Sequence, residues 1–220
     1  MASALALLFG AIGGLILAQI ARRLIEKIDA DLEKPNKVLW LVGCVGGSTM
    51  ALLILRRFDT IELRVGYAML CAGLLIQSMI DFYTHRLVRQ ITHGIAIAGV
   101  TTLVFAAWRD DTADKLVVAG VCAVSGAVLA STVNMISRNS LGVGDLRLMF
   151  VLGWFSGYLG YDSAILTLFS SSFFAAVFGL ILVAFRRATW RHQIAFGPFL
   201  MLGAVVAIFA GKYLPALFVA

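Results

Sequence analysis

The stretch VGYAMLCAGLLIQSMID, residues 65–81, is apolar or small at almost every position and ends in an aspartate. A helix needs about 20 apolar residues, with about 17–25 tolerated, to cross the hydrocarbon core of a bilayer. Comparable apolar runs lie along the rest of the chain, at about 2–21, 38–55, 91–108, 116–136, 146–161, 164–185 and 194–219. The sequence therefore predicts an all-α fold, a polytopic bundle of about eight transmembrane helices.

The composition supports a membrane protein and excludes several other classes. Of the 220 residues, 61% are hydrophobic and only 14% are charged, whereas a soluble domain has about 45–50% apolar and about 25% charged residues. The charges are too few to cover a soluble surface, which excludes a soluble globule, a disordered chain and a secreted disulfide scaffold. The net charge of +6 is expected of a membrane protein, because Lys and Arg gather in its cytoplasmic loops. Nucleic acid is not expected as a partner.

The loops between the predicted spans are short, and the longest polar one runs only from Arg22 to Lys37. We therefore expect residues 1–220 to form a single integral membrane domain. The odd-numbered loops contain twelve Lys and Arg residues, and the even-numbered loops contain five. This excess predicts that the odd-numbered loops are cytoplasmic and that both termini lie on the other side of the membrane.

Two aspartates, Asp81 and Asp145, lie at the ends of apolar runs, whereas the other acidic residues lie in polar loops. By the loop count both lie at the cytoplasmic boundary of the membrane. A carboxylate there is costly to desolvate and is a candidate functional residue. Either residue alone is equally well explained as the solvated end of a helix, with Asp145 as a helix N-cap. Two aspartates on one face, however, permit chemistry with a shared proton.

Asp145 closes the sequence Leu141-Gly142-Val143-Gly144-Asp145. Glycine has no side chain and adopts backbone conformations that other residues avoid. We therefore expect Gly142 and Gly144 to let an extended peptide approach the carboxylate closely, as proteolysis requires.

Three stretches resemble the motifs of type IV prepilin peptidases, and they occur in the same order along the chain. Residues 140–148, SLGVGDLRL, resemble the second aspartate motif of that family, and residues 80–92, IDFYTHRLVRQIT, resemble the first. Residues 194–204, IAFGPFLMLGA, are similar to the signature of the last helix. The resemblance implies an intramembrane aspartic peptidase of the Gly-x-Gly-Asp type, with Asp81 and Asp145 as its catalytic pair.

The resemblance also indicates further residues of the site. They belong to the active-site loop and to the start of the last helix: Gly142, Gly144, Arg147, Phe196, Gly197 and Pro198. Some positions depart from the family pattern. Val88 and Arg89 stand where the family has proline followed by Asn or Asp. Arg147 stands where it has lysine, which keeps the charge but not the geometry of an ammonium group.

A cysteine-bearing cytoplasmic domain follows the first helix in bifunctional members of the family and is linked to N-methylation of the product. Residues 22–37 contain no cysteine, so the resemblance implies a short form that cleaves without methylating. We expect no disulfide, because Cys44, Cys71 and Cys122 lie in separate apolar runs. The isolated His85 and His93 do not suggest a metal site, and no cofactor is expected.

The implied function is removal of the basic leader from a prepilin, pseudopilin or archaeal-flagellin-like precursor at the cytoplasmic face of the cell membrane. Two adjacent carboxyls share a proton near neutral pH. The ionised carboxyl activates water, and the protonated one donates to the scissile carbonyl oxygen. A helix N-terminus favours negative charge, so Asp145 is expected to be the base and Asp81 the acid, although a coupled pair has no firm single-site assignment.

Two other functions stay open at this point. One is a proton-coupled transporter that uses the two aspartates as relay sites, although such sites are expected nearer the middle of the bilayer. The other is an inactive relative that serves as an assembly scaffold. Two further motifs are not assigned to the site: Asp162 is expected on the opposite side of the membrane, and Gly153-x-x-x-Gly157 indicates close packing of helices.

Overall fold

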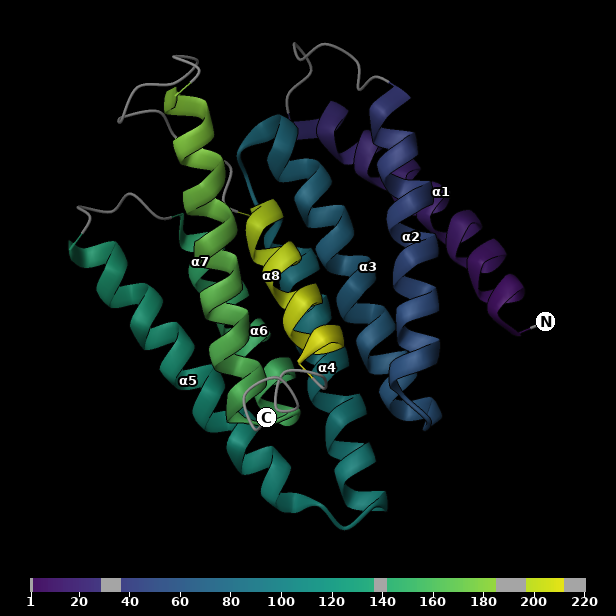
Figure 1. Ribbon diagram of the computed structural model, residues 1–220, viewed down its shortest axis with the longest axis vertical. Coiled ribbons are helices and arrows are strands. Elements are labelled where there is room, and N and C mark those ends of the chain that lie inside the picture. The colour runs from purple at the N-terminus through teal and green to yellow at the C-terminus, as the bar shows by residue number, and fades with distance from the viewer. Residues whose placement is uncertain (1, 29–36, 137–141, 185–196, 212–220) are drawn as a thin grey trace.

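The structure is a computed structural model that describes residues 2–28, 37–136, 142–184 and 197–211. Within these ranges the chain forms eight helices (Figure 1). In chain order they are α1 (Ala2–Ile28), α2 (Lys37–Arg57), α3 (Ile61–Thr84), α4 (Arg89–Arg109), α5 (Ala113–Ile136), α6 (Val143–Tyr158), α7 (Tyr161–Ala184) and α8 (Gly197–Ala210). The predicted all-helical membrane bundle is therefore confirmed.

The described helices differ in length, and six of them are long and apolar enough to cross a membrane: α1 to α5 and α7. The remaining two described helices are too short by this measure, and α6 has the length of its predicted span, 146–161, but lies three residues earlier in the chain. Helix α6 has 16 residues, which rise about 24 Å, less than the about 30 Å of a bilayer core. The described part of α8 has 14 residues.

Two helices continue three or more residues beyond the C-terminal ends that the apolar runs predict. Helix α1 extends past residue 21 to Ile28, where Arg22 and Glu26 form an ion pair one turn apart at 2.9 Å. Helix α3 continues to Thr84, so Asp81 lies inside its last turn. Hydropathy marks where apolar side chains stop, whereas the backbone hydrogen bonds of a helix continue through polar residues.

Helices α3 and α8 form the centre of the bundle. Figure 1 shows α8 between α7 and α3, with α1 and α2 on one flank and α5 on the other. The phenol of Tyr67 on α3 is fully buried, donates to the carbonyl oxygen of Phe155 on α6 at 2.8 Å, and stacks on Phe58 with ring centroids 4.2 Å apart. These contacts fix α3, which carries Asp81, against α6, which carries Asp145.

The Gly153-x-x-x-Gly157 motif packs α6 closely on α5, as the sequence predicts. A Cβ atom added at Gly153 would lie 2.5 Å from the carbonyl oxygen of Cys122, and one at Gly157 would lie 2.6 Å from the Cys122 Cβ. Neither position tolerates a side chain without separating the two helices.

Helix α8 is held at several points along its length. The hydroxyl of Ser170 on α7 donates to the carbonyl oxygen of Gly203 at 3.0 Å. The guanidinium of Arg57, at the end of α2, donates to the carbonyl oxygen of Ile208 at 3.2 Å. A cation near the C-terminal end of a helix complements its dipole. These contacts limit movement of α8 along its own axis, which matters because its first residue contacts Asp81.

Candidate active site

Asp81 lies in the last turn of α3, and only 5% of its surface is exposed. The helix ends beyond it because His85 adopts a left-handed conformation, with φ of 51°. The His85 N–H then donates to the carbonyl oxygen of Asp81 at 2.9 Å. This C-terminal turn fixes the backbone that carries the carboxyl.

The carboxyl of Asp81 meets the N-terminus of α8. The N–H of Gly197 donates to Asp81 Oδ2 at 2.8 Å in a buried setting. The first N–H groups of a helix have no partner within the helix and favour a negative charge. A Cβ atom at residue 197 would lie 2.7 Å from Asp81 Oδ2, so only glycine permits this approach.

Asp145 lies in the first turn of α6 and is half-buried. The expectation that it caps α6 is wrong, because Gly142 occupies the N-cap position and the N–H of Asp145 donates to the Gly142 carbonyl at 3.0 Å. The pKa of the Asp145 carboxyl is raised to about 6, chiefly because burial penalises its charged form and also because the charge of Asp81 lies nearby. A hydrogen bond from the Gly142 backbone acts in the opposite direction. The two carboxyls therefore interact.

Gly144 has a different neighbour from the one that we expected. A Cβ atom at residue 144 would lie 2.8 Å from the Cβ of Leu87, in the loop that follows Asp81. The space beside Gly144 is therefore filled by this chain and is not open to a substrate peptide. Gly142 is exposed, and the nearest atom to a Cβ there would be Oδ2 of Asp145 itself, at 3.3 Å. Of the two glycines, only Gly142 leaves room next to the carboxyl.

The remaining predicted site residues differ in how close they lie to the two carboxyls. Pro198 follows Gly197 in the first turn of α8. Arg147 is half-buried on α6, but residues two positions apart on a helix do not face each other, so Arg147 does not share the face of Asp145. Phe196 lies outside the described residues.

Sequence reasoning missed Gln77, which lies one turn before Asp81 on α3 and is 1% exposed. Its amide contacts the start of α4: Oε1 accepts from the N–H of Val88 at 2.8 Å, and Nε2 donates to the Val88 carbonyl at 3.1 Å. The same Nε2 donates to Thr92 Oγ1 at 2.7 Å. The sequence does contain a signal for this residue: a glutamine lies inside an apolar run, and a buried amide is almost always hydrogen-bonded.

An apolar groove of about 190 Å³ opens beside Asp81, between the start of α2, the end of α3 and the start of α8. It is lined by Val38, Leu39, Val42, Ser78, Met79, Phe82, Tyr83 and Pro198. Phe82, the residue after Asp81, is 64% exposed. The lining residue Phe82 follows Asp81 on α3, and the lining residue Pro198 follows Gly197, whose N–H contacts Asp81.

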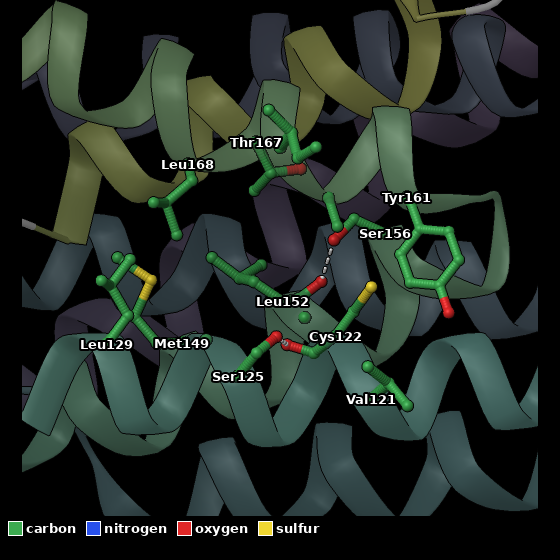
Figure 2. Close-up of a pocket in the computed structure, with 14 residues that line it drawn as sticks. Val121, Cys122, Ser125, Leu129, Met149, Leu152, Ser156, Tyr161, Thr167 and Leu168 are labelled. Atoms are coloured by element: carbon green, nitrogen blue, oxygen red, sulfur yellow. Dashed lines mark hydrogen bonds between the residues drawn. The ribbon is translucent and has the colours of Figure 1, made fainter.

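A second cavity, of about 200 Å³, lies between α5, α6 and α7 (Figure 2). The hydroxyls of Ser125 and Ser156 donate to carbonyls of their own helices, those of Cys122 and Leu152. Among the described residues, no carboxyl or imidazole lines this cavity. It offers no acid or base for peptide hydrolysis and is not the active site.

Other candidate groups lie away from the carboxyl pair. Asp162 is exposed in the first turn of α7, beyond the opposite end of α6 from Asp145, as the sequence predicts. Within the described ranges no three His, Cys, Asp or Glu side chains lie close enough together to hold a metal ion.

An all-helical membrane bundle that brings two interacting carboxyls beside an apolar groove has the arrangement of a membrane aspartic peptidase. The pattern of the type IV leader peptidase family matches residues 68–180, slightly more than half of the chain. The chain therefore belongs to this family and is an aspartic-type peptidase. No curated protein and no solved structure matches it. The matched residues include Asp81 and Asp145 but not α8.

Proposed function

We propose that Asp81 and Asp145 are the catalytic pair of a peptidase that removes the basic leader from type IV prepilin-like precursors. The observation that carries the proposal is the interaction between the two carboxyls at one end of the bundle, where the charge of Asp81 raises the pKa of Asp145. Family membership supports the substrate class, because type IV leader peptidases act on such leaders. Family membership favours this role over that of a proton-coupled transporter, because the family is one of peptidases.

We assign the proton of the pair to Asp145. Its pKa is raised to about 6 by burial and by the charge of Asp81, which favours the protonated form. The N–H that Asp81 accepts from the N-terminus of α8 offsets part of the cost that burial places on the charged form of Asp81. Asp81 then removes a proton from the attacking water, and Asp145 donates its proton to the oxygen of the scissile carbonyl. When the tetrahedral intermediate collapses, the C–N bond breaks, the leaving amine takes the proton that Asp81 received from water, and a hydroxyl of the intermediate returns a proton to Asp145 as the new carboxyl group forms. This assignment reverses the one expected from the helix ends alone.

The groove beside Asp81 suits the apolar helix that follows the leader in such a precursor. Its lining is apolar except for Ser78 and the hydroxyl of Tyr83, and Ser78 is engaged with Leu75 and Met201. A helix lying in the groove brings its N-terminal end, where the leader is cut, to the carboxyl pair. We propose that precursors such as pilins, pseudopilins and archaeal-flagellin-like subunits bind in this way and are cut at the cytoplasmic face, without N-methylation.

The test is cleavage of a precursor with a basic leader, a glycine and an apolar helix by the full chain in membranes. Asp81→Asn and Asp145→Asn should each abolish cleavage, because each removes one of the two proton-transfer groups, while expression and insertion stay intact. The matched control is Asp162→Asn, which should cleave at the wild-type rate. Near-normal turnover by either of the first two variants would remove that residue from the mechanism, and an inactive wild type would favour the scaffold role.

A further inference from the structure

Gln77 connects α3, the helix that carries Asp81, to the start of α4, although it does not touch either carboxyl group. Its amide is buried and forms three hydrogen bonds, two to the backbone of Val88 and one to Thr92. Both partners lie beyond the loop that follows Asp81, eleven and fifteen residues along the chain. A single side chain on α3 thus fixes where α4 begins.

Val88 needs such a partner. It is the N-cap of α4, and its own side chain makes no capping hydrogen bond. Its N–H donates to Gln77 Oε1 and has no other acceptor in the described part of the chain. A buried backbone N–H without a partner is destabilising. The Gln77 oxygen therefore determines whether this turn of the chain is stable in its present position.

A movement of Val88 would reach Asp145 through Leu87, the residue before Val88. Leu87 packs its Cβ directly on the backbone of Gly144, where an added Cβ would lie only 2.8 Å away. Gly144 precedes Asp145 in the first turn of α6. A shift of the loop at residues 87 and 88 consequently moves or releases the turn that holds the second carboxyl.

We propose that Gln77 is a positioning residue of the peptidase: by fixing Val88 it holds Leu87 against Gly144 and so sets where Asp145 lies relative to Asp81. This inference rests on the proposed function, because it assumes that the two carboxyls act as a pair. The geometry required for proton transfer is narrow, and a misplacement of about 1 Å costs about 100-fold in rate.

The backbone at residue 88 would also accept proline, a residue without an N–H. The backbone of Val88 has φ of −79° and ψ of 112°, close to the φ of about −65° that proline requires. A proline would therefore fit here and would leave no donor for Gln77 to satisfy. Valine supplies that donor, and the glutamine accepts from it.

The experiment is a double-mutant cycle on the full chain in membranes, with the precursor described above as substrate. Gln77→Leu removes the acceptor of the half-buried Val88 N–H. We therefore expect kcat to fall about 10- to 100-fold with KM little changed, because the groove is untouched. Adding Val88→Pro removes the unpaired donor, while Thr92 still reaches the Val88 carbonyl at 3.5 Å. The double variant should therefore recover to within about threefold of the wild type, a coupling expected of residues in contact.

Two measurements separate positioning from loss of fold. Hydrogen exchange of a peptide covering residues 85–92 should be faster in Gln77→Leu, while protection in α5 and α7 stays unchanged. Gln90, exposed on α4, supplies the matched control, and Gln90→Leu should behave as wild type. If Gln77→Leu does not accumulate, Gln77→Asn, whose amide is one methylene too short to reach Val88, replaces it in the cycle.

The outcomes distinguish this inference from the function on which it rests. Wild-type turnover in Gln77→Leu, or no recovery when Val88→Pro is added, would overturn the positioning role while leaving the carboxyl pair intact. Turnover that survives Asp81→Asn and Asp145→Asn would instead overturn the proposed function itself.

Discussion

Asp145 lies in the first turn of α6, where the helix dipole favours its ionised form, and yet its pKa is raised to about 6. Asp81 lies at the C-terminal end of its own helix, where a negative charge is disfavoured, but it accepts the N–H of Gly197 from another helix. Burial and tertiary contacts thus outweigh the dipoles of the helices to which the two residues belong. This is why the roles proposed above, Asp81 as base and Asp145 as acid, differ from the roles that the helix ends alone predict.

The interaction of the two carboxyls can be tested by titration. Asp81→Asn removes the negative charge that opposes ionisation of Asp145, so the pKa of Asp145 should fall below about 6. It should stay above the ordinary value of aspartate, because burial, the larger cause, is unchanged. Infrared difference spectra of protein with ¹³C-labelled aspartate would follow the carboxyl band against pH.

Asp162→Asn provides the reference for that titration, since Asp162 is exposed and lies beyond the far end of α6. It should leave the midpoint of Asp145 unchanged. A midpoint that stays the same or rises in Asp81→Asn would show that the two carboxyls do not interact.

Helix α8 has two electrostatic partners at its two ends. The carboxyl of Asp81 meets its first residue at 2.8 Å, and the guanidinium of Arg57 donates to the carbonyl of Ile208 near its last turn at 3.2 Å. Both contacts match the sign of the helix dipole. The helix therefore contributes to the site through its backbone, and its N-terminus takes the place of a charged side chain beside Asp81.

Gly197→Ala tests this contribution. The added Cβ would lie 2.7 Å from Asp81 Oδ2, so the carboxyl or the start of α8 must shift and the hydrogen bond is lost. We expect cleavage to fall about 100-fold in the membrane assay. Gly94→Ala is the matched control, because nothing lies within 4 Å of a Cβ there, and alanine favours a helix by about 1 kcal/mol over glycine. Equal turnover in both variants would show that α8 does not hold Asp81.

At the scale of the whole molecule, the sequence predicts what depends on local composition. The apolar runs locate eight helices, and the aspartates stand out as acids at the ends of such runs. The sequence alone does not predict which residues far apart in the chain come into contact. Gly197 and Asp81 are 116 residues apart, and the packing of Leu87 on Gly144 reflects how the loop after α3 folds over α6. The predicted ends of α1 and α3 were also too early, because hydropathy does not report where a helical backbone ends.

The five cations of the even-numbered loops bear on the orientation that the loop count predicts. Arg57 and Arg64 donate to the carbonyls of Ile208 and Phe58. Arg109 pairs with Glu62, and the Lys115 ammonium lies 5.8 Å from the ring centroid of Tyr158. Four of the five cations thus have structural partners at that end of the bundle. The fold accounts for these four cations, because each contacts another part of the chain. They therefore do not argue against a cytoplasmic location for the end of the bundle that holds the carboxyls.

Single cysteines test that orientation in a chain whose Cys44, Cys71 and Cys122 are replaced by alanine. Arg86 lies exposed in the loop after α3, and Asp114 lies exposed at the start of α5. The excess of cations in the odd-numbered loops predicts a cytoplasmic location for residue 86. In intact cells an impermeant thiol reagent should therefore label Asp114→Cys and spare Arg86→Cys, whereas both should react once the membrane is permeabilised. The reverse pattern would place the carboxyl pair outside, where a basic leader retained in the cytoplasm does not reach it.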